Sequence, residues 1–352
     1  MPSSTIRKAP ALLGLVALTL GTPGPVTPLR AADVGAAEAP ASEGRLLVLN
    51  KGENTLMVFD VPSHRLLSKV AVGEEPHEVV PTPDGRKAYV SNVRGRSVSV
   101  VDLERYRVLK TIKAESLDYP HGMAVTPDGR WLLLTSEGSR RLVLIDARRD
   151  VIARTLTVSQ KGSHMVALVD QGKRAFVTNR ESDSVSLVGL PDLKVRRTIR
   201  LGPGPEGIAA APNGRLVVVA LQGSGQVALL DSASQEILAR LPAGQTPIRV
   251  AFAPRSFTAF VSNRGSDDVT VLDLLSRRVK ATVRVGRRPG GIVTNAAGTR
   301  AYVCNNDSAS VSVIAIPGFE VKEEIKAGAG PDGIAFVAAR PAAGRRPRRP
   351  GA

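Results

Sequence analysis

The stretch PHEVVPTPDGRKAYVSN, residues 76–92, decides the fold because it recurs along the chain at a nearly constant spacing. Matches without gaps begin at Pro120, Ser163, Pro205, Pro247 and Pro289, and a shorter match, PDGIAF, begins at Pro331. Successive starts are 44, 43, 42, 42, 42 and 42 residues apart. A fixed period of this length indicates an array built from one supersecondary unit per repeat.

Each repeat contains four apolar runs of strand length separated by turns rich in Gly, Asn, Asp and Pro. In the first full repeat we expect strands at 79–82, 87–92, 97–103 and 108–114. Asp84-Gly85 supplies the positive-φ position that a tight hairpin needs. Four antiparallel strands in each repeat predict a β-propeller blade.

The two ends of the repeat region complement each other. Residues 45–72 supply second, third and fourth strands without a first, and residues 333–337 supply a first strand alone. Joined, they make one blade, which removes the exposed sheet edges of an open array. A stacked solenoid, the competing interpretation, would not need complementary ends. The sequence therefore predicts an all-β, seven-bladed propeller of four-stranded antiparallel blades, closed by pairing the C-terminal strand with the N-terminal strands.

Four second strands end in related tetrapeptides: YVSN at 89–92, FVTN at 176–179, FVSN at 260–263 and YVCN at 302–305. With the Ser/Asp-rich turns and V-x-V-x-D strands that follow, residues 45–337 resemble the YVTN-repeat β-propeller family. The corresponding LLTS at 133–136 and VVAL at 218–221 depart from that pattern. The resemblance implies an extracytoplasmic propeller, similar in its repeat to the haem d1 propeller of nitrite reductase and to lactonase propellers.

The segments outside the repeats differ in composition from the rest of the chain. Residues 1–44 combine Arg7 and Lys8 with the apolar run ALLGLVALTL and an Ala/Pro-rich stretch, which is typical of a secretory signal and leader. The apolar run is about half of the ~20 residues that a membrane-spanning helix needs. Residues 340–352 contain five arginines and no acid, which predicts a basic disordered tail. We therefore expect an exported protein, periplasmic, secreted or on the cell surface, with a propeller at 45–339 and no transmembrane segment after signal removal.

The charge of the 352-residue chain is +16, and aromatic residues make up only 3%. The leader is neutral and the tail carries five positive charges, so about eleven belong to the propeller. One cysteine, Cys304, excludes an intramolecular disulfide framework, and its place at a strand end predicts a small packed thiol.

The second position of each first strand defines a ring at the mouth of the central channel, because first strands are innermost in a propeller. Read around the ring, the residues are His77, His121, His164, Glu206, Ile248, Gly290 and Asp332, and Glu78 and Arg249 follow at the next position. Adjacent imidazoles with carboxylates nearby suit a divalent metal, so His77, His121 and His164 are candidate ligands. The alternative is a set of channel-lining groups that bind water, with side chains too far apart to share one ion.

The turns on the opposite face carry mostly positive residues. Those connecting first and second strands include Arg86, Lys87, Arg130, Lys173, Arg174, Arg215 and Arg300. Such a face attracts polyanions. The alternative is that the charge serves solubility and reflects the arginine bias of a high-GC coding sequence. Tyr106 is the one aromatic residue that we identify in these turns, which disfavours binding to nucleic acid by base stacking.

No nucleophile elbow, phosphate-binding loop or haem-attachment motif occurs in the sequence. We therefore expect a non-catalytic, monomeric binding or interaction scaffold with an unknown protein or small-molecule ligand. The alternatives are a metal- or cofactor-dependent enzyme, an oxidoreductase or lactonase-like hydrolase using the histidine ring, and weak polyanion binding by the basic face.

Overall fold

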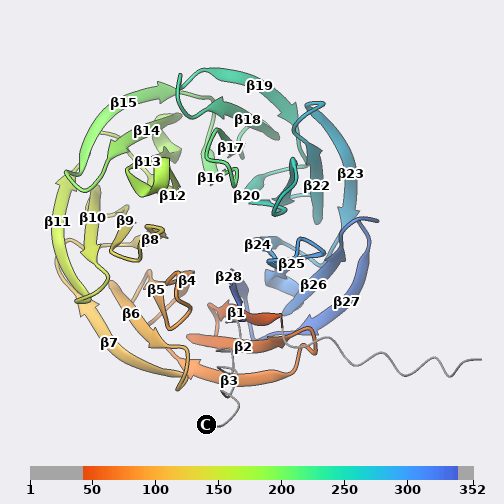
Figure 1. The fold of residues 1–352 in the computed structure, drawn as a ribbon, viewed down its shortest axis with the longest axis horizontal. Coiled ribbons are helices and arrows are strands. Elements are labelled where there is room, and N and C mark those ends of the chain that lie inside the picture. The colour runs from red at the N-terminus through yellow and green to blue at the C-terminus, as the bar shows by residue number, and fades with distance from the viewer. Residues whose placement is uncertain (1–42, 340–352) are drawn as a thin grey trace, which may run out of the picture. The chain divides into compact units, whose positions relative to one another are not determined.

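A computed structural model describes residues 43–339 and arranges them in seven four-stranded antiparallel sheets around a central axis (Figure 1). The seven-bladed, all-β propeller predicted from the repeats is confirmed. We number the blades from the first complete repeat. In each blade the first strand lies nearest the axis and the fourth forms the rim (Figure 1).

The strands follow the repeats in chain order. Blade 1 comprises β4 (Pro76–Pro81), β5 (Lys87–Asn92), β6 (Ser97–Asp102) and β7 (Arg107–Lys113). Blade 2 comprises β8 (Pro120–Val125), β9 (Trp131–Ser136), β10 (Arg141–Asp146) and β11 (Val151–Thr157). Blade 3 comprises β12 (Ser163–Val169), β13 (Arg174–Asn179), β14 (Ser184–Gly189) and β15 (Lys194–Arg200). Blade 4 comprises β16 (Pro205–Ala210), β17 (Leu216–Leu221), β18 (Gln226–Asp231) and β19 (Ile237–Pro242).

The remaining blades keep the same order. Blade 5 comprises β20 (Pro247–Phe252), β21 (Thr258–Asn263), β22 (Asp268–Asp273) and β23 (Arg278–Arg284). Blade 6 comprises β24 (Pro289–Thr294), β25 (Arg300–Asn305), β26 (Ser310–Ala315) and β27 (Val321–Lys326). Blade 7 comprises β28 (Pro331–Ala338), β1 (Gly44–Asn50), β2 (Thr55–Val61) and β3 (Leu66–Ala71). Short 3₁₀ turns lie at η1 (Asp170–Gly172), η2 (Arg180–Ser182) and η3 (Asn306–Ser308).

The ring closes in blade 7, where β28 pairs antiparallel with β1 from Gly44↔Ala338 to Asn50↔Pro331. The order β28-β1-β2-β3 repeats the order of every other blade. The complementary chain ends recognised in the sequence therefore form one blade, and β1 has no free inner edge.

The inner strands begin earlier than the sequence suggested. We expected the first strand of blade 1 at 79–82, but β4 starts at Pro76, so His77 and Glu78 lie within the strand. The apolar run predicted too late a start for this strand. The polar residues before the run also pair with β5, from Pro76↔Asn92 onward.

The core consists of clusters between successive blades, built mainly from Val, Leu and Ala on the buried strands. In the cluster between blades 1 and 2, Val98 and Val100 pack with Leu132 and Leu134, all fully buried. Each such side chain contributes about 1.5–3 kcal/mol by leaving water. Among the described residues, no helix is long and apolar enough to cross a membrane.

The asparagine that ends many second strands spans the turn to the third. Asn179 Nδ2 donates to Ser184 Oγ at 3.1 Å and to Ser186 Oγ at 2.9 Å, and Asn92 contacts Ser97 and Ser99 in the same way. The asparagine of the Y/F-V-x-N motif thus stabilises the turn between the second and third strands. These turns lie on the upper face, which we define as the face on which the first strands begin.

Candidate functional site at the channel mouth

The three predicted ring histidines lie on consecutive inner strands and their rings contact one another. His77, His121 and His164 stand at the second positions of β4, β8 and β12. The centroid distance is 3.8 Å between His77 and His121, and 3.7 Å between His121 and His164. Neighbouring blades therefore bring the three rings into contact, which the sequence left open.

His77 and His121 face each other through their Nε2 atoms, which are 3.0 Å apart. His77 Nδ1 lies 3.3 Å from Glu78 Oε1, so the neutral ring donates from Nδ1 to the carboxylate. His121 is only 3% exposed, and its Nδ1 has no hydrogen-bond partner among the described residues.

His164 has a different environment from the other two histidines. Its Nδ1 lies 2.6 Å from Glu137 Oε1 and its Nε2 lies 2.8 Å from Glu206 Oε1. Arg180 approaches both carboxylates, at 3.9 Å from Glu137 and 3.6 Å from Glu206. Both ring nitrogens are thus engaged in a buried network of opposite charges.

Arg249 crosses the mouth from blade 5. Its Nη2 contacts Glu78 Oε1 at 2.6 Å, and its Nη1 lies 3.6 Å from Glu206 Oε1. The guanidinium therefore links the carboxylates of blades 1 and 4. Burial works against its charge, but Glu78 and Asp332 outweigh that effect and raise the pKa of Arg249.

Asp332, on β28, completes the ring next to His77. It pairs with Lys51 and lies 3.8 Å from both His77 Nε2 and Arg264 Nη2. Asp332 is 1% exposed, and despite that burial the charge of Lys51 holds its pKa below the ordinary value.

These surroundings separate the protonation states of the three histidines. Burial, followed by the charge of Lys51, lowers the pKa of His77, and burial followed by the neighbouring His164 lowers that of His121 well below its ordinary value. Burial also opposes protonation of His164, but Glu206 and Glu137 outweigh it and raise its pKa. Burial opposes ionisation of Glu206, yet His164 and Arg249 lower its pKa to about 2. The surroundings thus favour the neutral form of His77 and His121 and the protonated form of His164.

The ring positions Ile248 and Gly290 add no polar group to the mouth. Further partners at the mouth come from the residue directly after the second strand in five of the blades. Lys51, Glu137, Arg180, Gln222 and Arg264 all occupy that position, and Gln222 Nε2 donates to Glu206 Oε2 at 3.3 Å. Aligning the repeats at the residue after the second strand, as well as at the second residue of the first strand, identifies these partners from the sequence.

The lower face is the face on which the first strands end and the second strands begin. Three of the basic residues predicted there pair with nearby acidic side chains. Lys87 contacts Asp150 at 2.7 Å, Arg86 lies 3.9 Å from Glu104, and Arg174 pairs with Asp170. Arg130 stacks over Trp131, 4.9 Å from the ring centroid. The other predicted residues, Lys173, Arg215 and Arg300, form no ion pair with any described residue.

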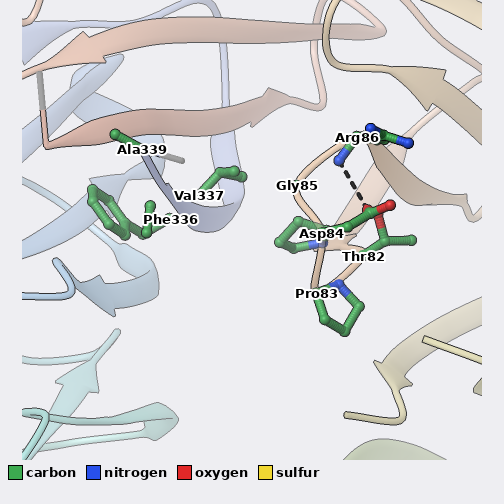
Figure 2. A pocket seen from close by; sticks show the side chains of 10 residues that line it. Thr82, Pro83, Asp84, Gly85, Arg86, Phe336, Val337 and Ala339 are labelled. Carbon is green, nitrogen blue, oxygen red and sulfur yellow. Dashed lines mark hydrogen bonds between the residues drawn. The ribbon is translucent and has the colours of Figure 1, made fainter. Parts of the chain in front are cut away.

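Open cavities lie between the first-to-second-strand turns of this lower face. One has a volume of 680 Å³. In it, Pro83 and Arg86 on the turn before β5 lie opposite Phe336 and Val337 near the end of β28 (Figure 2). A cavity of 270 Å³ between blades 4 and 5 has the apolar walls Leu216, Phe252, Phe257 and Leu274. Phe257 is 50% exposed, so the expectation that Tyr106 is the one aromatic in these turns is wrong.

Fold and repeat define the class of protein: a closed seven-bladed β-propeller with a charged cluster at one channel mouth. A sequence model described as YNCE-like beta-propeller matches residues 153–342, and the chain belongs to this family. No curated protein sequence matches the chain.

Solved structures share the fold at low sequence identity. Hydrazine synthase of Kuenenia stuttgartiensis is 21% identical with a TM-score of 0.69, over 82% of this chain and 99% of the other. A functionally unknown protein from Desulfotomaculum acetoxidans is 14% identical with a TM-score of 0.74, over 84% and 100%. The dihydro-heme d1 dehydrogenase NirN, solved in complex with DHE, is 15% identical with a TM-score of 0.61, over 85% and 76%. At these identities the likeness concerns the fold alone.

Proposed function

We propose that the protein is an exported binding propeller whose lower face docks an acidic polypeptide segment through a bulky apolar side chain. Export rests on the signal-like composition of residues 1–44. The observation that carries the binding role is the apolar cavity between blades 4 and 5, whose exposed wall, Phe257, lies on the arginine-rich face.

The cavity has the properties of a side-chain pocket. Its 270 Å³ volume and its walls of Leu216, Phe252 and Leu274 suit one aromatic or large aliphatic side chain. Phe257, at half exposure, leaves apolar surface in water beside it. Covering this surface would release water from both partners, which favours association.

The charges around the cavities suit an acidic partner. Arg255 lines the apolar cavity, and Arg215 lines an adjoining cavity of 510 Å³ that shares Asn213 with it. Arg148 lines a cavity of 420 Å³ between blades 1 and 2, farther round the same face. None of these three arginines forms an ion pair with a described residue. Carboxylates flanking the anchor would find unpaired guanidinium groups, which Arg recognises in bidentate geometry.

Selection of peptides from a displayed random library on the immobilised full chain tests the proposal. We expect the recovered peptides to carry Asp or Glu around one bulky apolar residue. Phe257→Ser should weaken their binding by about tenfold, which corresponds to about 1.4 kcal/mol. Arg255→Glu should weaken it further and reduce its dependence on salt.

Leu275→Ser is the matched control, because Leu275 is exposed on the same face but does not line the cavity. Equal losses for Leu275→Ser and Phe257→Ser would contradict the cavity as the anchor. Selected peptides without acidic residues, or tighter binding of a single-stranded oligonucleotide that ignores Phe257→Ser, would reject an acidic polypeptide. Turnover of a lactone or a redox substrate by the purified protein would contradict a purely binding role.

A further inference from the structure

We propose that His77 and His121, with Glu78 behind His77, form a mononuclear site for a divalent transition-metal ion at the upper mouth of the central channel. One donor atom from each of these residues lies within 4.8 Å of the others. The site is on the face opposite the apolar cavity, so it is independent of the peptide binding proposed above.

The first step concerns the facing nitrogens. If His121 donates from Nε2 to His77, the lone pair on its buried Nδ1 has no partner among the described residues. If the proton is on Nδ1 instead, two Nε2 lone pairs face each other at 3.0 Å. A cation between the two Nε2 atoms turns the second arrangement from repulsive to attractive.

The spacing of the two nitrogens suits cis ligands of one ion. Imidazole nitrogens bind Zn²⁺ at about 2.0–2.1 Å. Two such nitrogens are about 2.9 Å apart at a ligand angle of 90° and about 3.4 Å apart at the tetrahedral angle. The observed 3.0 Å falls between these values. With the ring centroids 3.8 Å apart, the two rings need only tilt away from each other to aim both lone pairs at one ion.

Glu78 orients the His77 ligand through one of its carboxylate oxygens. Its Oε1 accepts from His77 Nδ1 and contacts Arg249, which holds the His77 ring with Nε2 toward His121. A carboxylate behind a ligating histidine is a common arrangement at metal centres. Because Nδ1 and Nε2 lie on opposite sides of the imidazole ring, Glu78 supports His77 from behind, and water completes the coordination of the ion.

His164 is not a ligand of the proposed site, so two of the three histidines that the sequence suggested as metal ligands remain. Both of its ring nitrogens already contact carboxylates, Glu137 at 2.6 Å and Glu206 at 2.8 Å. Releasing either nitrogen for a metal would leave a buried carboxylate without its partner, which is strongly unfavourable.

The surroundings favour ions that bind imidazole strongly. Arg249 and Lys51 already compensate Glu78 and Asp332, so a hard cation that depends on carboxylates finds little free negative charge. Neutral imidazole prefers Zn, Cu and Ni over Mg and Ca. An ion held by two imidazoles and water keeps exchangeable positions for Lewis-acid chemistry, which gives the metal-dependent enzyme alternative its chemical basis.

Calorimetric titration of the chelator-treated full chain with Zn²⁺, Cu²⁺ and Mg²⁺ tests the site. We expect one equivalent of Zn²⁺ or Cu²⁺ to bind, a higher melting temperature with that ion, and no binding of Mg²⁺. His77→Ala and His121→Ala should each weaken the affinity by at least about a hundredfold, and Glu78→Gln by at least about tenfold.

His64→Ala is the matched control, because the His64 side chain is only 5% exposed but contacts Glu323 and Tyr302 away from the mouth. It should bind metal like the parent protein. Circular dichroism of each metal-free variant checks folding, and His121→Gln replaces His121→Ala if the latter does not fold. Absence of stoichiometric binding, an affinity unchanged by His77→Ala and His121→Ala, or equal affinity for Mg²⁺ would each overturn the proposal.

Discussion

At the scale of single residues, the channel mouth shows how ionisable groups are tolerated in a buried ring. Each buried ion loses hydration worth several kcal/mol, and only close pairing with further hydrogen bonds offsets that loss. Glu206 has this pairing, because His164, Arg249 and Gln222 surround its carboxylate. His121 is the exception, since its Nδ1 has no partner among the described residues.

The pairing of Glu206 predicts an acid-dependent contribution to stability. Its pKa is lowered from 4.5 to about 2, and a depressed carboxyl pKa stabilises the fold above the unfolded value. The contribution, about 3 kcal/mol, should be complete near neutral pH and disappear as the pH falls from about 4.5 through about 2.

Urea unfolding of the parent and of Glu206→Gln across this range measures the effect. The difference in free energy of unfolding should be largest above pH 4.5 and shrink toward pH 2. Glu320→Gln, at an exposed carboxylate beside Lys322, should give no such trend. A difference independent of pH would contradict the ionic role of Glu206.

At the scale of elements, side-chain hydrogen bonds link successive strands within a blade and link neighbouring blades. The second-strand asparagines fasten the turns, and Tyr89 links blades 1 and 2. Its hydroxyl donates to Ala147 O at 2.9 Å and to Asp150, which also pairs with Lys87. Burial and Asp150 raise the pKa of Tyr89, so the hydroxyl stays protonated as a donor.

Tyr89→Phe should lower the free energy of unfolding by about 1 kcal/mol. The ring remains, as Phe176 does at the equivalent position of blade 3, and only the hydroxyl contacts are lost. A double-mutant cycle with Asp150→Asn, followed by urea unfolding, isolates the pair and should give a coupling of about 1 kcal/mol. Additive effects of the two substitutions would show that the hydroxyl contributes nothing through Asp150.

At the scale of the whole molecule, one strand from the C-terminal end of the repeats closes the ring. β28 buries Ala335 and Val337 against blades 7 and 1, and it carries Asp332 to the channel mouth. Without it, β1 would present an unpaired edge, and open edges promote aggregation.

Deletion of residues 331–352 should therefore abolish the cooperative melting transition or give aggregated protein in size-exclusion chromatography. Deletion of residues 340–352 alone retains every described C-terminal residue, and it should melt like the full chain. A monomeric product of the longer deletion with an unchanged melting temperature would show that the closure does not stabilise the ring.

The sequence by itself determined the repeat, the number of blades and the shared closing blade, because a fixed period with complementary ends allows one ring. It also placed His77, His121 and His164 in one structural column, since equivalent residues of a repeat occupy equivalent places. The resemblance in the Y/F-V-x-N phrase pointed to the family, and the structure gives that asparagine a turn-fastening role.

Only the tertiary structure decided which of these equivalent histidines contact each other and which contact carboxylates. His121 turns toward His77 at 3.0 Å, while His164 is held between Glu137 and Glu206. The period gives each side chain its strand and its face, but the choice of partner depends on side-chain direction and on charges from other strands. Glu137 and Arg180 come from the ends of second strands, so their role at the mouth appears only when the blades stand side by side.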